Sequence, residues 1–379
     1  MATPQTSIVV TTIFEPAFLD GYLREIDLAG QRDQVTLRVI IDRKTPATVA
    51  AACAAARQQG FLVECPTLEE QEAHLKRWEL PSDFIPWNTD NRRNIGYLLS
   101  LEAGCDVLIS IDDDNFTLPD SNFLTGHQVV GQTATDPIVS TSDGWYNICN
   151  LLDGWGDGEI YARGFPYYAQ RVDRTIQMGS ATQPLKVAMN AGLWLDEPDV
   201  DAVYRLCRRA KGKEFTGPDV VLDANTWSPV NTQNTALMRD AALTYYYVKM
   251  GFPLKGLSID RFGDILSGYL TQKCVKHLGY GVRLGTPVVD HRRTPHNFFK
   301  DLYHELAGIV LIEEFLPWLI EAKLDGSTPL EAYASLATQM HDVTDQFTGF
   351  IWDDGGRDFL RQTAGNMQTW IECVRRIAG

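Results

Sequence analysis

Short apolar runs alternate with helical patterns in the first third of the chain. Compact runs rich in Val, Ile and Leu predict strands, whereas apolar positions three and four residues apart predict helices. The expected strands cover residues 7–13, 35–42, 61–66 and 106–111. The expected helices cover residues 18–30, 46–60 and 88–104. Because strands and helices alternate, we expect a parallel sheet covered by helices on both faces.

The pattern changes after this region. Residues from about Gly131 to Leu270 are less regular and rich in Gly, Trp and Tyr. Rings interleaved with polar residues suit a surface that faces carbohydrate, and they equally suit an ordinary β-rich core with turns. The tail from about Phe299 is mostly helical. We therefore expect a nucleotide-binding α/β domain over residues 1–320 and a C-terminal helical extension, 321–379, packed on it.

Composition narrows the classes of protein. The 379 residues are 44% hydrophobic and carry a formal net charge of -15, so a nucleic-acid partner is not expected. The seven cysteines form no CxxC pair, which predicts a reduced, cytoplasmic protein. The start of the chain lacks a basic region followed by a long apolar core, so a signal peptide is not expected. No apolar run reaches the roughly 18 residues of a membrane span, so a membrane-spanning helix is not expected either.

Three aspartates, Asp112, Asp113 and Asp114, follow the fourth expected strand. Ligands of parallel sheets bind at the carboxyl ends of strands. Mn²⁺ or Mg²⁺ takes one or two carboxylates together with substrate phosphates. Asp112 and Asp114 can face one ion because side chains alternate along an extended chain, and Asp113 is assigned to the nucleotide. This D-x-D pattern is typical of nucleotide-sugar enzymes with a GT-A fold; an Asp-rich turn is the alternative.

Other charged residues extend this hypothesis. Asp42 ends the second strand, where it can bond a ribose or base edge or simply form a turn. Arg93 can reach a phosphate or brace Asp112, although a solvent-facing helix charge is the simpler interpretation. His291 is a candidate metal ligand, and Arg292 and Arg293 beside it suit a diphosphate; a lone histidine is more often structural.

Several longer segments carry a family resemblance. They are "ISIDDDNF", "YARGFPYYAQR" (161–171), "NAGLWLDEPDVDA" (190–202), "RFGDILSGYLTQKCVKHLGYGVRLGTPVVDH" (261–291) and "NFFKDLYHELAGIVLIEEFLPW" (297–318). Together they resemble the reversibly glycosylated polypeptides, also called UDP-arabinopyranose mutases. The likeness spans roughly residues 106–318 and is weaker before that.

The resemblance implies a GT-A-like fold, a divalent metal and a UDP-sugar whose ring is interconverted between pyranose and furanose forms. It also implies self-glycosylation on Arg163 and leaves open a homo-oligomer. Asp264 is our candidate for proton transfer to sugar hydroxyls. Arginine is a poor nucleophile, so stabilisation of the leaving diphosphate is the physical alternative for Arg163, and an ion pair with Asp157 or Glu159 is the structural one. No flavin is expected, since no G-x-G-x-x-G follows the first strand.

The chain departs from the family pattern at two places. Gly263-Asp264 stands where the family has Asp-Asp, and Asp42-Arg43-Lys44 stands where it has Asp-Gly-Asp. Both fall where nucleotide or sugar is read, so the resemblance does not define the sugar or the base. Two other functions stay open. One is a metal-dependent glycosyltransferase with an external acceptor, which an open groove beside Trp155 and Trp194 would favour. The other is a non-catalytic scaffold of a glycan-making complex.

Overall fold

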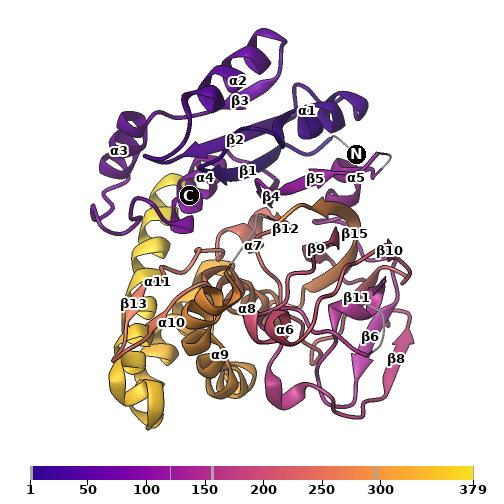
Figure 1. The fold of residues 1–379 in the computed structure, drawn as a ribbon, viewed down its shortest axis with the longest axis vertical. Coiled ribbons are helices and arrows are strands. Elements are labelled where there is room, and N and C mark those ends of the chain that lie inside the picture. The colour runs from indigo at the N-terminus through magenta and orange to yellow at the C-terminus, as the bar shows by residue number, and fades with distance from the viewer. Residues whose placement is uncertain (1–2, 120, 155–157, 294–296, 379) are drawn as a thin grey trace.

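The computed structural model describes residues 3–119, 121–154, 158–293 and 297–378, and these form one large mixed sheet with helices around it (Figure 1). The strand order is β3-β2-β1-β4-β12-β9-β15-β11-β6-β8, with β5 paired to β15. The strands of this sheet are β1 (Thr6–Thr12), β2 (Val35–Ile41), β3 (Leu62–Glu64), β4 (Val107–Asp112), β5 (Asn115–Thr117), β6 (Ile138–Thr141), β8 (Ile176–Gly179), β9 (Val187–Asp196), β11 (Val220–Leu222), β12 (Asn234–Met238) and β15 (Gly281–His291). Two small sheets pair β7 (Leu152–Asp153) with β10 (Glu214–Phe215) and β13 (Phe252–Pro253) with β14 (Ser258–Ile259).

The helices cover both faces of the sheet. They are α1 (Leu19–Leu28), α2 (Ala47–Gln58), α3 (Leu68–Arg77), α4 (Arg93–Glu102), α5 (Phe123–His127), α6 (Ala202–Cys207), α7 (Arg239–Ala242), α8 (Gly263–His277), α9 (Phe298–Glu321), α10 (Pro329–Val343) and α11 (Arg357–Ala378). The four predicted strands and three predicted helices of the N-terminal third are all present. Helix α3 was not predicted, although a capping box between Thr67 and Glu70 marks its start.

The N-terminal half of the sheet is parallel: β1 pairs with β2 on one side and with β4 on the other. Beyond β4, β12 runs antiparallel to both β4 and β9, and β15 then runs parallel to β9. The short strand β5 brings Asn115 opposite His291. The predicted GT-A-like fold is therefore present, with a parallel N-terminal half and a mixed central sheet. This topology brings the end of β4 close to the end of β15.

The aromatic residues of the middle section mostly belong to the core. Trp145, Tyr146, Trp194 and Trp227 are each less than 5% exposed. Of the two interpretations of this region, the β-rich core therefore describes these four residues. Trp155 lies outside the described residues.

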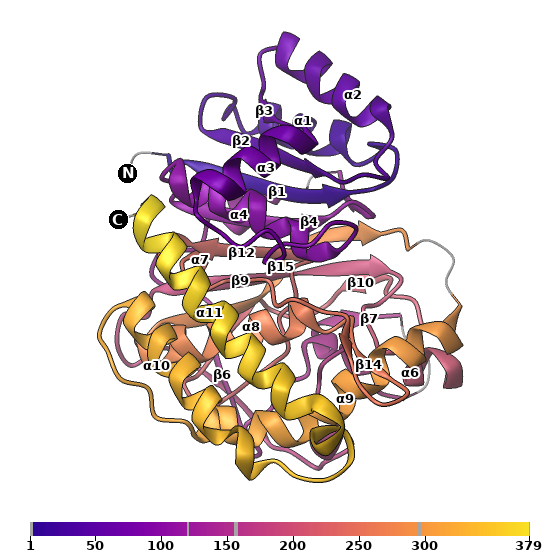
Figure 2. The ribbon, with the colours of Figure 1, turned by 90° about the vertical axis from the view of Figure 1, so that its left-hand side faces the viewer.

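The C-terminal helices pack on the rest of the chain. Helix α11 runs along one side of the molecule, and its C-terminal end lies beside α4 (Figure 2). There the Arg376 guanidinium donates to the Trp78 carbonyl oxygen at 2.8 Å and pairs with Glu79 at 3.1 Å. The boundary at residue 320 stays a prediction. No helix in the described ranges combines the length and apolarity that crossing a membrane requires.

Candidate active site

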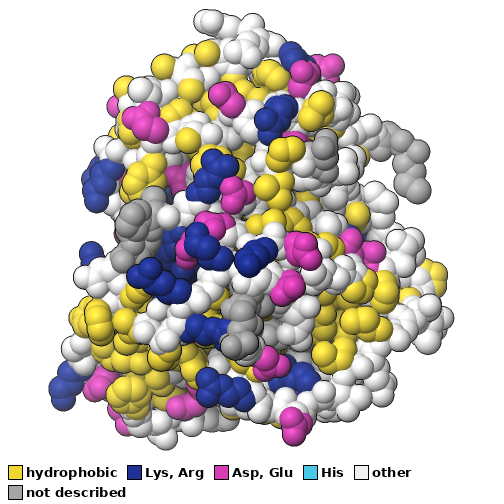
Figure 3. Space-filling view, turned by 45° about the vertical axis from the view of Figure 1, so that its right-hand side comes forward, with side chains coloured by type: hydrophobic (Ala, Val, Ile, Leu, Met, Phe, Trp, Pro, Cys, Tyr) yellow, Lys and Arg dark blue, Asp and Glu magenta, His cyan; other side chains and the backbone are white. Residues whose placement is uncertain are grey.

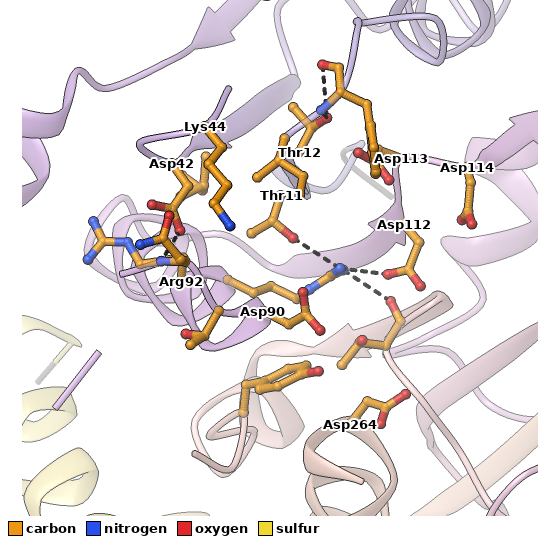
Figure 4. Close-up of a pocket in the computed structure, with 18 of the residues that line it drawn as sticks. Thr11, Thr12, Asp42, Lys44, Asp90, Arg92, Asp112, Asp113, Asp114 and Asp264 are labelled. Atoms are coloured by element: carbon orange, nitrogen blue, oxygen red, sulfur yellow. Dashed lines mark hydrogen bonds and ion pairs between the residues drawn. The ribbon is translucent and has the colours of Figure 1, made fainter. Parts of the chain in front are cut away.

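A cavity of about 300 Å³ opens at the carboxyl ends of β1, β2 and β4 (Figure 4). Its walls carry the acidic triplet together with the side chains Thr11, Thr12, Asp42, Lys44, Asp90, Arg92, Arg93, Arg163, Tyr247, Arg261 and Asp264. A second cavity of about 140 Å³ adjoins it and is lined by Asp112, Asp114, Arg163, Asp199, Gln233, Arg261, His291 and Arg293. The two cavities share four of these residues and form one recess, in which the predicted metal ligands and the predicted catalytic residues come together.

Asp112 is held in place by a buried arginine. The Arg93 guanidinium donates to Asp112 Oδ1 at 2.6 Å, to the Ile111 carbonyl oxygen at 2.7 Å and to Ser110 Oγ at 2.9 Å. Arg93 is only 4% exposed, so the interpretation as a solvent-facing helix charge was wrong, and the bracing contact is the one present. Burial raises the pKa of Asp112 to about 7 against the opposing charge of Arg93, and the like charges of Asp114 and Asp264 add to the rise.

Asp113 points toward the same cavity as Asp112 (Figure 4). Burial raises the pKa of Asp113 to about 6, although a hydrogen bond from Thr12 lowers it. Two adjacent carboxylates with raised pKa values form a site whose negative charge is not fully compensated by the chain itself. A cation or a basic ligand group would therefore be favoured there.

Asp114 and His291 face each other across the smaller cavity. His291 Nε2 lies 3.3 Å from Asp114 Oδ2, and His291 Nδ1 lies 2.6 Å from the Glu197 carbonyl oxygen. Burial lowers the pKa of His291, but the hydrogen bond and charge of Asp114 outweigh it and raise that pKa overall. In the described part of the chain, no three acidic, histidine or cysteine side chains gather closely enough to hold a metal ion by themselves.

Arg163 lies at the centre of a buried ionic cluster. Its Nε and one terminal nitrogen donate to the two carboxylate oxygens of Asp199, at 3.0 and 3.2 Å. Its two terminal nitrogens also donate to the oxygens of Asp264, at 3.1 and 2.5 Å, and one of them donates to the Arg261 carbonyl oxygen. All five N–H donors of the guanidinium are thus in use.

This cluster fixes the protonation of its members. Burial alone would lower the pKa of Arg163, but the charges of Asp199 and Asp264 outweigh it and raise that pKa well above its ordinary value. The Arg163 guanidinium in turn holds the pKa of Asp199 well below its usual range, against the effect of burial. The alternative partners expected for Arg163 were wrong in part: Glu159 accepts from Tyr161 instead, and Asp157 lies outside the described residues.

Two glycines set the packing around this cluster. Gly164 has φ +87°, and a Cβ added there would lie 2.4 Å from Ile265 Cγ2, so Arg163 sits where the backbone presses against α8. Gly263 is equally crowded, because a Cβ there would lie 2.5 Å from the Val248 carbonyl oxygen. The first carboxylate of the family's Asp-Asp pair therefore has no room in this chain, while Asp264 keeps its place in the cavity.

Asp42 lies at the opposite end of the larger cavity. Its carboxylate accepts from the backbone N–H of Arg43 and of Asn88, both at 2.6 Å, and it is 7% exposed. These bonds hold the loop after β2 against the segment before α4. The Lys44 ammonium points into the cavity near Thr11 and Asp90 (Figure 4). A cation thus occupies the region where the family pattern has a second aspartate.

The two arginines after His291 differ in placement. Arg292 pairs with Asp290 at 2.6 Å, stacks over Phe116 and is 62% exposed, and it lines neither cavity described above. Arg293 lines the smaller cavity, and its side chain is 10% exposed. Burial, helped by the charge of Arg205, lowers the pKa of Arg293 to about 10. Only Arg293 is therefore placed to reach a ligand beside Asp114.

Asp90, Asp199 and Arg261 are among the cavity residues that were not predicted. Arg261 has φ +55°, a strained value for a residue with a Cβ, and its guanidinium pairs with Glu305 of α9 at 3.1 Å. Asp199 and Arg261 both lie inside segments that carry the family resemblance, so a signal was present, but nothing local in the sequence pairs them with Arg163. Asp90 precedes α4 and carries no distinguishing pattern.

The face of the molecule drawn in Figure 3 is mixed in charge. On the face shown in Figure 3, Lys and Arg side chains are interspersed with Asp and Glu, and apolar side chains gather below them. The fold and the recess, with an acidic triplet after β4 and a carboxylate–arginine cluster beside it, define an enzyme with a GT-A-like fold.

Within that class the chain belongs to the reversibly glycosylated polypeptide family, whose model matches residues 59–378. Curated relatives include a probable UDP-arabinopyranose mutase 1 of Pisum sativum, 26% identical over 286 residues, which cover 74% of this chain and 70% of that protein. UDP-arabinopyranose mutase 2 of Arabidopsis thaliana is 26% identical over 284 residues, with the same two coverages.

A solved structure, glucosyl-3-phosphoglycerate synthase from Mycobacterium tuberculosis with Mn²⁺ and UDP-glucose, aligns with a TM-score of 0.40 and 12% identity over 82% of this chain and 79% of that one. A mannosyltransferase from Pyrobaculum calidifontis with GDP-mannose and Mn²⁺ aligns with a TM-score of 0.36 and 10% identity, over 99% and 87% of the two chains.

Proposed function

We propose that this protein is a UDP-sugar mutase that interconverts the pyranose and furanose forms of the sugar. The observation that carries the proposal is the Arg163 cluster, which lies in the same recess as the acidic triplet. A transferase needs only to stabilise the leaving diphosphate, whereas a mutase must also hold the sugar while its ring opens and closes. Curated relatives named UDP-arabinopyranose mutases support this choice.

The larger cavity supplies the nucleotide site in this proposal. Asp42 and Lys44 line its far end, where a nucleoside would be read, and the acidic triplet lies at the other end. The rigid bonds of Asp42 to the backbone mean that the loop after β2 is already ordered before a ligand arrives. The diphosphate would then lie between the triplet and the basic side chains Arg261 and Arg293.

The residues at the smaller cavity fit a divalent ion that is completed by the substrate. Asp114 Oδ2 and His291 Nε2 face each other at 3.3 Å, and the Glu197 carbonyl fixes the other imidazole nitrogen, as second-shell carbonyls do for metal-binding histidines. Asp112 keeps Oδ2 free of Arg93. Bound Mn²⁺ or Mg²⁺ would neutralise charge on the leaving diphosphate, and the diphosphate oxygens would supply the ligands that the chain lacks.

The sugar-side chemistry in this proposal belongs to Arg163 and its carboxylates. The anomeric C–O bond breaks and its electron pair leaves with the diphosphate. One guanidine nitrogen of Arg163 forms a bond to the anomeric carbon, and its proton passes to a carboxylate oxygen of Asp264 or Asp199, which already lie at hydrogen-bond distance. The ring C–O bond then breaks with a proton from that carboxylic acid.

Reclosure completes the interconversion. A different sugar hydroxyl attacks the anomeric carbon and gives its proton back to the carboxylate. The diphosphate returns to the anomeric carbon, the C–N bond breaks, and Arg163 regains its proton. The raised pKa of Arg163 opposes the loss of its proton, so nucleophilic attack would develop only as the anomeric carbon becomes electron-poor.

The test is incubation with UDP-arabinopyranose and a panel of other nucleotide sugars in Mn²⁺, with separation of pyranose, furanose, free sugar and glycosylated protein. We expect ring interconversion with at least one UDP-sugar, lost on addition of EDTA. Asp114→Asn should abolish interconversion and weaken UDP in calorimetry while the far-UV circular dichroism is unchanged. Metal-independent binding with full activity of Asp114→Asn would contradict the metal assignment.

The same panel tests the two other functions. Sugar transfer to an added acceptor without interconversion would favour the glycosyltransferase, and inertness toward every nucleotide sugar would favour the scaffold. Trp194 is buried and cannot line an open acceptor groove through its ring, while Trp155 lies outside the described residues. The structure therefore adds no observation in favour of transfer.

A further inference from the structure

A third cavity, of about 530 Å³, lies away from the candidate active site, between the last turns of α8 and α9. Its basic lining residues are Lys273, Lys276, His277 and Lys323, and Glu321 is its one carboxylate among the described residues. This is unexpected in a chain with a net charge of -15, in which acidic residues outnumber Lys and Arg by 49 to 34. Trp227, which is 3% exposed, contributes its ring to the wall.

The two inner lysines have no carboxylate partner among the described residues. Lys276 Nζ donates to the carbonyl oxygens of Asp223 at 2.6 Å and Thr226 at 2.9 Å, and Lys273 Nζ donates to the Ile320 carbonyl oxygen at 2.7 Å. Each ammonium has three N–H donors, so both keep donors for another group. Both also lie over the Trp227 ring, at 5.3 and 6.0 Å from its centre.

The ordinary role of lysines near a helix end is to satisfy the terminal carbonyls of that helix. Lys273 fits this in part, because Ile320 is in the last turn of α9. Lys276 does not, because Asp223 and Thr226 lie in the loop between β11 and β12. Burial of an ammonium group costs free energy. It lowers the pKa of Lys276 to about 7, against the charge of Asp223, and that of Lys273 to about 8, against the charge of Glu321.

We propose that this cavity binds a phosphate-bearing small anion. The ammonium groups of Lys273, Lys276 and Lys323 supply the charge, and Trp227 forms the wall beside them. Phosphate suits this arrangement because several point-charge donors can each take a separate oxygen. The site is separate from the acidic triplet, and the proposal does not depend on the mutase function.

The site also has a structural connection to the active-site recess. Helix α8 carries Asp264 in its first turn and Lys273 and Lys276 near its end. Helix α9 carries Glu305, which pairs with Arg261, in its N-terminal part, and it ends at the cavity. A bound anion that orders the ends of both helices therefore acts on two elements that position the Arg163 cluster.

The test is titration of the full chain with inorganic diphosphate, and separately with inorganic phosphate, in EDTA and at constant ionic strength. We expect saturable binding to the wild-type chain, weakened more than about tenfold in Lys276→Met, since a charge-assisted hydrogen bond is lost. Lys323→Met, at an exposed position, should weaken it about two- to fivefold. Lys255→Met removes the same charge from an exposed residue elsewhere and should leave the affinity unchanged.

The proposal is overturned if the wild-type chain shows no saturable binding of either anion. It is also overturned if Lys276→Met and Lys255→Met bind alike, or if sulfate binds as tightly as diphosphate, which would indicate unspecific attraction. Should Lys276→Met fail to fold, the comparison of Lys323→Met with Lys255→Met decides the question. Binding to the active site alone would leave all three lysine variants equal to the wild type, and this outcome too would refute the site.

Discussion

Replacing Arg163 by lysine separates catalysis from structure at the centre of the site. Lysine keeps the positive charge but offers three donors from one nitrogen in place of five arranged in a plane. At least two of the five bonds to Asp199, Asp264 and the Arg261 carbonyl must therefore be lost. Charge-assisted hydrogen bonds contribute about 1.5–3 kcal/mol each, so after relaxation we expect the free energy of unfolding to fall by about 3 kcal/mol.

Catalysis should fall much further than stability. The lysine nitrogen cannot occupy the position of both terminal guanidine nitrogens, so bond formation at the anomeric carbon and proton transfer to Asp264 would both be misaligned. We expect ring interconversion and protein labelling to be undetectable in Arg163→Lys, while UDP binding in calorimetry stays within about threefold of wild type. Mass spectrometry of the wild-type digest should map one glycosyl unit to the peptide of residues 161–171.

Arg174→Lys is the matched control. The side chain of Arg174 is 9% exposed, belongs to the same stretch of chain and pairs with Asp143 at 3.0 Å, yet it lines neither part of the recess. This variant should lose some stability and keep full interconversion. Both variants are assayed at a temperature at which circular dichroism shows them folded. Interconversion that persists in Arg163→Lys would refute covalent capture by the guanidine and leave Arg163 either a structural role or the stabilisation of the leaving diphosphate by its charge.

Three further predictions follow from packing and charge. Gly164→Ala forces a Cβ against Ile265 at a left-handed φ, so the denaturation midpoint should fall by the equivalent of about 1–3 kcal/mol. Interconversion should fall more than UDP affinity. An unchanged midpoint would mean that the backbone at Gly164 adjusts without cost, and would contradict the prediction. Burial lowers the pKa of His127 to about 3, so below about pH 6.5 the unfolded chain protonates this imidazole and the folded chain does not. The free energy of unfolding should therefore fall toward acid by up to about 1.4 kcal/mol per pH unit. His127→Gln should remove that part of the slope, and a pH profile identical to that of the wild type would refute the prediction. Arg293→Ala should weaken UDP more than uridine in calorimetry whereas Arg292→Ala should leave both unchanged, and equal losses for both ligands in Arg293→Ala would place that side chain away from the diphosphate.

The strands and helices of the first third could be predicted because each is specified by its own apolar pattern. β1, β2 and β4 are compact runs of Val, Ile and Leu, and a buried parallel strand needs nothing more. The strands in the middle of the chain could not be predicted for the opposite reason. Strand β9 is specified by its pairing with β12 and β15, which lie far along the chain, and no local pattern encodes those partners.

The candidate site divides in the same way. Asp112, Asp113 and Asp114 could be identified because three carboxylates at the end of a strand are a local signal. The partners of Arg163 could not: Asp199 lies 36 residues away and Asp264 lies 101 residues away, and only the folded sheet and α8 bring them to the same guanidinium. The choice between Arg292 and Arg293 as the diphosphate residue depends on the direction in which each side chain points after the end of β15, and the sequence does not encode this locally.

The structure gives a physical explanation for the two departures from the family pattern, at Gly263 and at Lys44. At Gly263 the backbone lies against Val248 and Tyr247 so closely that no side chain fits. The first carboxylate of the family pair is therefore excluded by packing, and Asp264 is the member of that pair that faces Arg163, together with Asp199. At the other end of the recess Lys44 brings a cation to the nucleotide side. The two changes act in the same direction, since one removes a negative charge and the other adds a positive one. We therefore expect the recess to accept a more negatively charged ligand than one that carried both family aspartates would.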